Sequence, residues 1–416
     1  MAKENMSKLE RLIQQYCPDG VEYVPLSSIG TIKRGNGLQK KDFVKAGIGC
    51  IHYGQIYTKF GLFTNKTLTY VDKELADHLL HIEKGDLVIA CTSENVEDVC
   101  KAVAWLGDDS IVTGGHSCVL HHNQNPKYIA YFFQTESFQR QKRKYAYGTK
   151  VIDIKPDSIG KIEIPLPPLP VQEEIVRILD AFTELQAELQ AELQKRLQQY
   201  EYYKWNIFEG LSCPTKHITD VALVKARVGW QRLTTAEYQE TGDYYLITGT
   251  DFKNGKIDFN SCVFVSKERY EMDPNIIVGK GDILITKDGT LGKVAFMAEE
   301  PNKPTTLNSG VFRIHTTDLQ VSSRYLFHYF TSKYFTDFVN SVKTGSTIPH
   351  LTQQGLVSLN IPIPSLEEQN RVVSILDRFD TLTTDLTQGL PAEIEKRRQQ
   401  YEYYRDKLLT FKRKGA

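Results

Sequence analysis

The sequence predicts an α+β fold with two α/β domains, each containing a twisted β core and each followed by a long helix. Two segments 197 residues apart are nearly alike and have the pattern of helices. The regions before them are rich in short β-branched and aromatic runs separated by glycine, asparagine and aspartate. We therefore expect domains at residues 1–163 and 213–360 and spacer helices at residues 164–212 and 361–416.

The repeat is clearest in the predicted helices. Residues 164–182, IPLPPLPVQEEIVRILDAF, recur as residues 361–379, IPIPSLEEQNRVVSILDRF, and residues 198–203, QQYEYY, recur unchanged as residues 399–404. Prolines precede both helices, acidic pairs suit their first turns, and apolar residues then recur in steps of three and four. Such a regular apolar face is typical of a coiled coil, so each helix offers the other a partner.

The two helices are not the same length. Residues 183–194 of the first read TELQ, AELQ, AELQ, whereas the second copy has four extra residues and contains Gly389-Leu390-Pro391. Proline removes a backbone donor and clashes with the preceding turn, so we expect a kink or break there. We interpret both helices as spacers without chemistry of their own.

The domains match more faintly than the helices. Residues 84–89, KGDLVI, parallel residues 280–285, KGDILI, and both read as a turn followed by a buried strand. Residues 128–133 parallel residues 325–330. Outside these matching segments the sequences of the two domains differ strongly. We therefore expect the two copies to share a fold and to differ in their surfaces.

The amino-acid composition excludes several classes of protein. The 416 residues are 41% hydrophobic and 25% charged, and no run of about 18 apolar residues or secretory signal is present, so we expect a cytoplasmic protein without a membrane partner. The net charge is zero, but both helical segments are more acidic than basic, which leaves a basic excess in the domains. The seven cysteines lack metal-ligand spacing and are expected to be reduced, mostly buried thiols.

The sequence contains no recognisable catalytic motif. Residues 287–294 approach a P-loop but lack its first glycine and final hydroxyl residue, and residues 47–49 lack the third glycine of a dinucleotide site. The tetrad of adenine methyltransferases is absent. His116, His121 and His122 have no acidic or cysteine partner nearby, so a surface or core role is favoured over a metal site. We therefore expect a protein that is not an enzyme, with no cofactor and no metal in this chain.

Basic, amide and hydroxyl residues at turns form candidate nucleic-acid-binding sites at matching places of the two copies. Lys and Arg neutralise phosphates or read guanine, Asn and Gln read adenine, and acidic side chains accept from cytosine. The alternative is that these are ordinary solvated turn residues. The candidates are Lys33, Arg34, Asn36, Tyr53, Gln55, Thr92, Ser93, Arg140, Lys142, Arg143, Lys144, Thr149 and Lys150 in the first copy, and Arg227, Trp230, Thr248, Thr250, Asp251, Lys287, Thr290, Lys333, Lys343, Ser346 and Thr347 in the second.

The chain resembles the specificity subunit of type I restriction-modification systems. The resemblance is carried by the two IPxPxL-to-ILDxF boundaries, the QQYEYY repeats, the KGDLVI and KGDILI marks, and residues 17–23, CPDGVEY. It implies a pseudo-twofold molecule in which antiparallel helices separate two target-recognition domains, each reading half of a split, asymmetric site on double-stranded DNA. It also implies two modification subunits that bring S-adenosylmethionine and two restriction subunits that use ATP and Mg²⁺.

The unequal helices suggest how the gap between half-sites is set. Four residues add about 6 Å and about 40° beyond a full helical turn, while one base pair rotates DNA by about 35°. One tetrad more or fewer would therefore shift the gap by about a base pair. An alternative function is a stand-alone DNA-binding or scaffold protein that has lost its partners; a purely structural coiled-coil adaptor is disfavoured by the two divergent domains.

Overall fold

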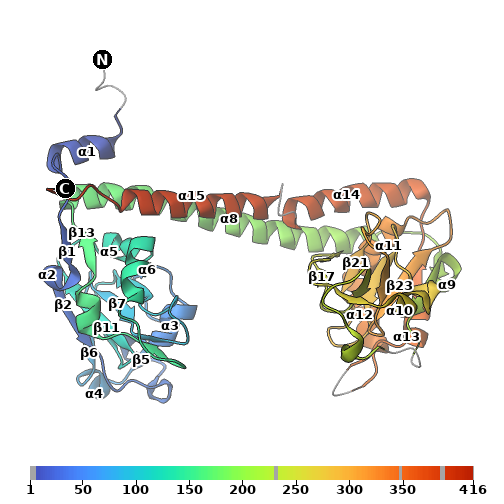
Figure 1. Cartoon of the computed structure of the whole chain (residues 1–416), viewed down its shortest axis with the longest axis horizontal. Helices are drawn as coiled ribbons and strands as arrows, with labels where there is room; N and C mark the ends of the chain where they lie inside the picture. The colour runs from blue at the N-terminus through green and yellow to red at the C-terminus, as the bar shows by residue number, and fades with distance from the viewer. Residues whose placement is uncertain (1–5, 229–232, 346–348, 385–388, 416) are drawn as a thin grey trace. The chain divides into compact units, whose positions relative to one another are not determined.

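The computed structural model describes residues 6–228, 233–345, 349–384 and 389–415, and it divides into two compact units. Unit 1 comprises Met1–Glu188 and Ile394–Ala416, and unit 2 comprises Leu189–Glu393. Each unit contains one α+β domain, part of the long helix α8 (Leu169–Glu209) and part of the second helical segment (Figure 1). The prediction of two mixed domains joined by long helices is confirmed.

Unit 1 contains a five-stranded sheet of order β2-β11-β7-β9-β4 and a four-stranded sheet of order β5-β3-β10-β6. The pairs β1-β13 and β12-β8 complete it. The strands are β1 (Tyr23–Pro25), β2 (Gly30–Arg34), β3 (Ile48–Ile51), β4 (Phe63–Thr64), β5 (Thr69–Val71), β6 (Leu80–Ile82), β7 (Leu87–Ala90), β8 (Thr92–Ser93), β9 (Ala102–Trp105), β10 (Ile111–Thr113), β11 (Ser117–His122), β12 (Ile152–Asp153) and β13 (Glu163–Pro165). The helices before α8 are α1 (Lys8–Tyr16), α2 (Leu26–Ile29), α3 (Tyr53–Thr58), α4 (Lys73–Ala76), α5 (Pro126–Phe132), α6 (Glu136–Arg143) and α7 (Pro156–Gly160).

Unit 2 repeats this topology. Its sheet β15-β23-β20-β21 corresponds to β2-β11-β7-β9, its sheet β19-β16-β22 corresponds to β5-β3-β10, and β14-β24 corresponds to β1-β13. The strands are β14 (Thr215–His217), β15 (Ala222–Ala226), β16 (Tyr244–Ile247), β17 (Phe252–Lys253), β18 (Lys256–Ile257), β19 (Val263–Val265), β20 (Ile283–Thr286), β21 (Val294–Phe296), β22 (Thr305–Leu307), β23 (Val311–Thr316) and β24 (Asn360–Pro362). Its helices are α9 (Ile218–Val221), α10 (Lys267–Glu271), α11 (Ser323–Phe330), α12 (Lys333–Val342), α13 (Gln353–Val357) and α14 (Leu366–Thr384).

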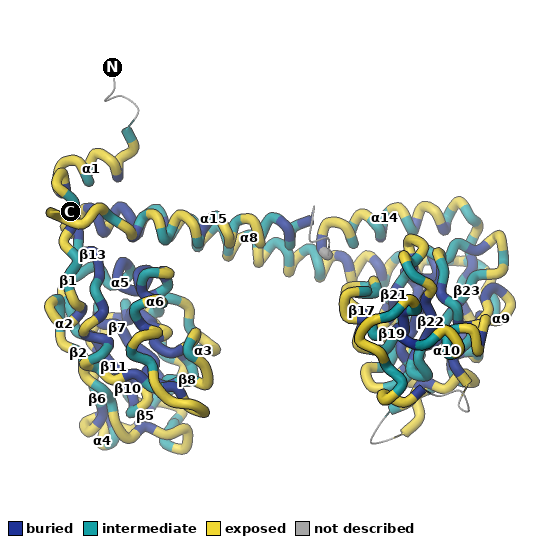
Figure 2. The backbone as a smooth tube through the Cα atoms, viewed as in Figure 1, coloured by how far each residue is buried: buried dark blue, intermediate teal, exposed yellow. Residues whose placement is uncertain are grey.

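The two Lys-Gly-Asp marks form the same turn before the same strand. Gly85 and Gly281 have φ angles of 95° and 86°, which glycine adopts without strain. The Asp86 carboxylate accepts from the backbone N–H of Glu83 at 2.6 Å, and Asp282 accepts from Gly279 at 2.8 Å. Strands β7 (Figure 2) and β20 follow, and every residue in both is buried. The predicted core strands are therefore confirmed.

A shared set of hydrogen bonds from buried side chains holds the boundary between each domain and the helix that follows it. The Tyr128 hydroxyl donates to the Pro165 carbonyl at 2.8 Å, and the Tyr325 hydroxyl donates to Pro362 at 2.7 Å. The repeated glutamine is also fully buried: in unit 1, Gln172 Nε2 donates to the Pro167 carbonyl at 2.8 Å. In unit 2 the same bond joins Gln369 to Pro364 at 2.9 Å. These contacts explain why the proline-rich boundary recurs in both copies.

Asp180 anchors the first part of α8 to the domain in unit 1. Its carboxylate accepts from Lys127 Nζ at 2.6 Å and from the Tyr131 hydroxyl at 2.7 Å. Both donors lie on α5, which is packed in the main core of the unit. The helix and the domain are therefore joined by an ion pair as well as by apolar packing.

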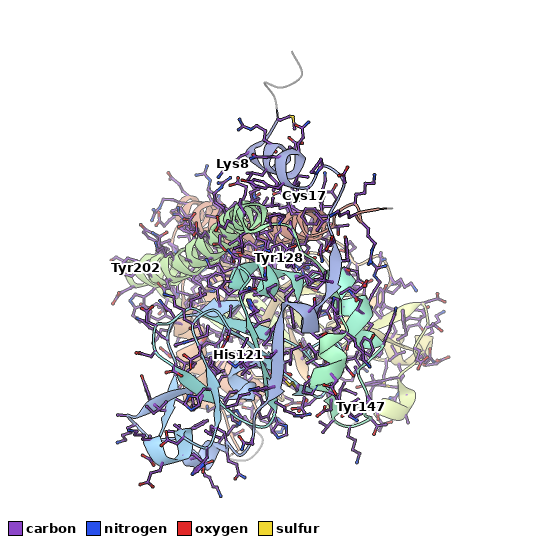
Figure 3. All side chains as sticks on the ribbon, turned by 90° about the vertical axis from the view of Figure 1, so that its left-hand side faces the viewer. Lys8, Cys17, His121, Tyr128, Tyr147 and Tyr202 are labelled. Carbon is purple, nitrogen blue, oxygen red and sulfur yellow. A yellow bond between two sulfur atoms is a disulfide. The ribbon has the colours of Figure 1, made fainter. Side chains whose placement is uncertain are left out.

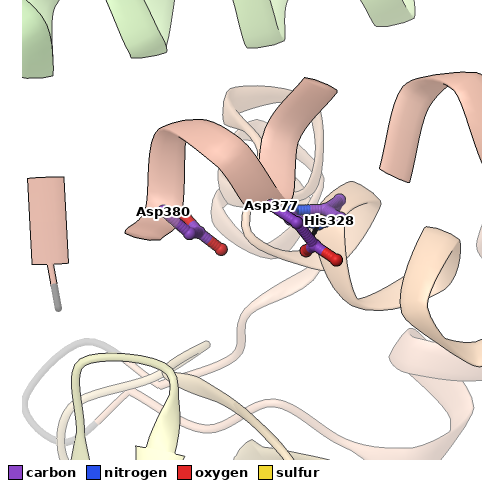
Figure 4. A group of neighbouring side chains, drawn as sticks. All are labelled: His328, Asp377 and Asp380. Atoms are coloured by element: carbon purple, nitrogen blue, oxygen red, sulfur yellow. Dashed lines mark hydrogen bonds and ion pairs between the residues drawn. The ribbon is translucent and has the colours of Figure 1, made fainter. Parts of the chain in front are cut away.

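Asp377 occupies the equivalent place in unit 2, where α14 meets α11 (Figure 4). Its Oδ1 atom lies 2.7 Å from Arg324 Nη2 and 2.7 Å from Nε2 of the buried His328. Asp380 Oδ2 lies 3.6 Å from the same guanidinium nitrogen. Because Arg324 already supplies the cation, we interpret His328, Asp377 and Asp380 as an ionic contact between helices rather than as a metal site.

Helix α8 is continuous over 41 residues, whereas the second helical segment is broken. Helix α14 ends at Thr384, and a separate helix, α15 (Leu390–Leu408), begins after Gly389. Pro391 stands in the first turn of α15, where its missing N–H has no helical partner to lose. The predicted break is therefore confirmed. Within unit 1, Phe182 of α8 stacks on Tyr404 of α15 with ring centroids 5.6 Å apart, and within unit 2, Tyr200 of α8 stacks on Phe379 of α14 at 5.7 Å.

The cysteines depart from the prediction at one pair. Cys91 and Cys118 form a disulfide, so the expectation that all seven are reduced is wrong for these two. Cys91 follows β7 and Cys118 lies on the paired strand β11, which brings their Cα atoms within 6.3 Å. The remaining cysteines are free thiols, and all but the half-buried Cys213 are buried.

No helix in the described ranges combines the length and the apolar character that crossing a membrane requires.

Candidate nucleic-acid interface

In unit 1, several predicted binding segments meet at one end of the five-stranded sheet. Strand β12 pairs with β8, which places Asp153 beside Thr92, and Tyr147 forms a further bridge with Asp153. Arg34, the last residue of β2, binds the Asp153 carboxylate through both terminal nitrogens, at 3.0 and 2.7 Å. Figure 3 shows Tyr147 at the end of the domain away from α8, with Tyr128 near the helix. The backbone pairings of Thr92, Tyr147 and Asp153 therefore hold these loops together, and we call them the frame of unit 1.

A cavity of about 520 Å³ opens within this frame. The Tyr53 ring lines it and lies 4.7 Å from the ring of His116. The Thr92 hydroxyl lies 3.0 Å from His116 Nδ1, and the Tyr57 hydroxyl donates to the Thr92 carbonyl at 2.7 Å. Ser93 also lines the cavity and is half-buried. The cavity thus offers aromatic faces together with polar groups.

Several basic residues lie close in the sequence to the residues of the frame, and their side chains are exposed to solvent. Lys33, Arg140, Lys144 and Lys150 are exposed and form no ion pair with any described residue, and Asn36 and Thr149 are exposed as well. Arg143 is exposed and lies 3.6 Å from Glu136. Unpaired cations on a solvent-facing surface are the groups that neutralise DNA phosphates. Direct contact of these residues with DNA stays a prediction.

Unit 2 has the same backbone frame. Asp288 forms a bridge with His350, and Thr344 forms a second bridge with His350, as Thr92 and Tyr147 do with Asp153 in unit 1. The side chains differ, because here an ion pair joins His350 to Asp288. A cavity of about 410 Å³ beside this frame is lined by the exposed residues Thr290 and Lys343.

Other predicted residues of unit 2 lie in varied settings. Lys287 is half-buried, with Nζ 5.4 Å from the centroid of the Phe312 ring. Thr250 is exposed, and the Thr248 hydroxyl lies 2.7 Å from the Thr250 hydroxyl. Trp230, Ser346 and Thr347 lie outside the described residues.

Lys333 is not brought together with Lys343. The two residues flank opposite ends of the ten-residue helix α12, which separates them by about 15 Å along its axis. Lys333 pairs with Asp337 at 2.7 Å, and its Nζ lies 5.2 Å from the centroid of the Trp205 ring on α8. The structure therefore places Lys333 beside α8 and away from the frame of unit 2. This corrects the prediction that Lys333 and Lys343 belong to one binding site.

Four predicted DNA contacts are corrected because the side chains are buried and bound within the domain: Thr92, whose hydroxyl contacts His116, and Lys142, Arg227 and Asp251. Lys142 is 1% exposed, and its Nζ donates to the Glu97 and Val99 carbonyls at 2.7 and 2.9 Å. Arg227 is 2% exposed and donates to the Leu307 carbonyl at 2.9 Å. Burial disfavours the charged form and lowers the pKa of both groups.

Asp251 is 1% exposed. Its carboxylate accepts from the backbone N–H of Thr248 at 2.7 Å and from the Ser261 hydroxyl at 2.9 Å, so it shapes the turn after β16. Gln55 is similarly engaged, because its Oε1 accepts from the His52 N–H at 3.0 Å and its Nε2 donates to the Thr69 hydroxyl at 3.1 Å. Both side chains therefore stabilise loops.

The predicted DNA contacts include Tyr53, Thr92 and Ser93 of the unit 1 cavity and leave out most of its other lining residues. Glu94, Asn95 and Val151 line it together with Tyr53 and other residues. The available signal was the position of Glu94 and Asn95 directly after the predicted residues 92 and 93. Val151 carried no such signal, because pairing of β12 with β8 brings it there.

Comparison with known protein families finds the same internal repeat. A family model described as the type I restriction modification DNA specificity domain matches residues 18–199 and again residues 215–396. The Escherichia coli type I restriction enzyme EcoR124I/EcoR124II specificity subunit is 29% identical over 421 residues, which cover 98% of this chain and 97% of that one.

Two solved structures show a similar fold. One comes from work on complex assembly and conformational transition of the type I R-M system; it has a TM-score of 0.63 and 16% identity, covering 95% of this chain and 98% of that chain. The other, the HsdS subunit from Thermoanaerobacter tengcongensis, has a TM-score of 0.50 and 16% identity, covering 98% and 99%. The two matches of the family model fall on the two copies of the internal repeat, and the chain belongs to the family of type I restriction-modification DNA specificity proteins.

Proposed function

We propose that this chain is the DNA sequence-specificity subunit of a type I restriction-modification complex and that each domain reads one half of a bipartite, asymmetric DNA site. One observation carries the proposal. Both units have the same backbone pairings at equivalent positions, and the residues that form these pairings differ between the units. A common backbone with different side chains is what two unlike half-sites require.

The frame explains how recognition differs between the units. In unit 1 the residue paired with Thr92 is Asp153, which holds Arg34, whereas in unit 2 the equivalent His350 is paired with Asp288. The groups presented around each frame therefore differ in charge and shape. Exposed cations such as Lys33, Lys144 and Lys150 would supply phosphate contacts that position the domain without reading sequence.

The repeated helices offer a surface for modification subunits. Tyr202 and Tyr203 are 62% and 46% exposed in unit 2, and Tyr403 and Tyr404 are 61% and 36% exposed in unit 1. Tyrosine is enriched at protein interfaces and among residues that carry binding energy. Because these exposed residues are identical while the domains differ, both sites fit the same kind of partner, which supports binding of two modification subunits.

The chemistry of the complex belongs to those partners in this proposal. The modification subunits would hold S-adenosylmethionine and methylate adenine, and two restriction subunits would use ATP and Mg²⁺. This chain contributes recognition, and the length of its helices contributes the gap between the half-sites.

Selection from a library of randomised DNA duplexes tests the proposal. The full chain, assembled with its modification subunits, is expected to enrich duplexes with two short conserved blocks separated by a fixed number of unconserved base pairs. A single contiguous motif, or no enrichment, would contradict it. A control variant with Lys33, Lys144 and Lys150 changed to alanine is expected to bind every duplex more weakly and with a smaller dependence on salt, while keeping the same motif.

A further inference from the structure

The unit 1 cavity contains a carboxylate with no internal role. Glu94 lines the cavity, is exposed, and forms no hydrogen bond or ion pair with any described residue. The other acid of the cavity, Asp98, is engaged, because its carboxylate accepts from Asn95 Nδ2 at 2.9 Å and its backbone N–H donates to Asn95 Oδ1 at 2.7 Å. Glu94 therefore does not stabilise the loop that carries it.

A free carboxylate is unfavourable on a surface that approaches DNA, because the phosphates repel it. Its favourable partners are hydrogen-bond donors. Among the base edges in the major groove these are the amino groups, N4 of cytosine and N6 of adenine. Guanine and thymine present acceptors there, so a carboxylate would reject them.

The walls of the cavity suit the edge of a base. The Tyr53 and His116 rings lie side by side at 4.7 Å, and Val151 is 60% exposed although its side chain is apolar. Apolar side chains at such positions contact the edges of bases, including the methyl group of thymine. The cavity thus combines an acceptor for an amino group with aromatic and apolar side chains in its lining.

The residue at the equivalent position of unit 2 supports a role of Glu94 in reading a base. Glu94 stands two residues after Thr92, and Thr290 stands two residues after Asp288, which makes the matching bridge of the frame. Thr290 is exposed and lines the cavity of its own unit. The same backbone position therefore carries a carboxylate in one domain and a hydroxyl in the other.

We propose that Glu94 is a specificity-determining residue that accepts a hydrogen bond from an amino-bearing base, cytosine or adenine, in the half-site bound by unit 1. The inference rests on the proposed function, since it requires that the domain binds DNA. Thr290 takes the equivalent place for the half-site bound by unit 2.

The test applies the same randomised duplex library to the wild-type chain, Glu94→Ala and Glu94→Gln, each assembled with the modification subunits. In Glu94→Ala, the preference at one position is expected to fall by roughly 5- to 150-fold, the range that a good base contact provides. All other positions should be unchanged. Glutamine pairs well with adenine, so Glu94→Gln is expected to retain the preference if the base is adenine and to lose it if the base is cytosine.

Thr290→Ala is the matched control, because it should alter only the other half-site. An unchanged preference at every position in Glu94→Ala would overturn the inference while leaving DNA recognition intact. Absence of any motif with the wild-type chain would instead overturn the proposed function itself. Equal thermal midpoints of the variants would exclude loss of folding as the cause.

Discussion

Lys142→Met is expected to destabilise unit 1 without directly removing a DNA contact. The buried ammonium of Lys142 donates to the carbonyls of Glu97 and Val99, which belong to the loop between β8 and β9. A hydrogen bond from a charged donor contributes about 1.5–3 kcal/mol, and a buried carbonyl left without a partner costs about 1–3 kcal/mol. Methionine avoids the desolvation of the ammonium, which offsets part of this loss. We expect a net decrease of about 2–4 kcal/mol in the free energy of unfolding.

Urea unfolding of the full chain, followed by hydrogen exchange of the amides at residues 94–100, measures this effect. The matched control is Lys144→Met, which alters an exposed lysine two residues away and should change stability by less than about 0.5 kcal/mol. The reasoning is refuted if Lys142→Met unfolds like the control and instead lowers the salt dependence of DNA binding as a phosphate contact would.

Three further predictions concern the helices. Burial lowers the pKa of His328 below 6.5, so the unfolded chain binds the proton more readily and unit 2 loses stability as pH falls from 6.5 through the folded pKa. His328→Tyr, which copies the equivalent Tyr131, should remove this dependence in thermal melts; an unaltered pH profile would count against the assignment. Changing both Tyr202 and Tyr203 to alanine should weaken calorimetrically measured binding of a modification subunit by about 1–3 kcal/mol, whereas Tyr16→Ala, 44% exposed on α1, should not. Deleting residues 187–190 should shorten α8 by about 6 Å and change the gap between half-sites by about a base pair; an unchanged gap in mapped methylated sites would refute this role.

The helices and the core strands could be predicted because local patterns determine them. The proline boundaries, the acidic first turns and Pro391 act within a few residues, so the extent of α8 and the break before α15 follow from the sequence. The Lys-Gly-Asp turns are equally local, since the glycine φ and the aspartate side chain act within one turn.

The binding surface could be predicted only in part, because burial of a charged side chain depends on distant partners. Its basic neighbours place Lys142 among the predicted phosphate contacts. It lies four residues after the buried Phe138 on α6, however, and this helical spacing indicates that both side chains face the core. Arg227 offered no local signal, since its acceptor on Leu307 is 80 residues away. The Glu94 cavity likewise combines segments around residues 53, 94, 116 and 151.

The central claim is that two unlike domains on one chain read two separate half-sites. Mapping methylated adenines across the genome of cells with and without this gene, in the presence of the modification subunit, tests that claim most directly. We predict that the gene adds one asymmetric motif with two specific blocks separated by a gap of fixed length. A contiguous or palindromic motif, or a methylation pattern that does not change with the gene, would contradict the account.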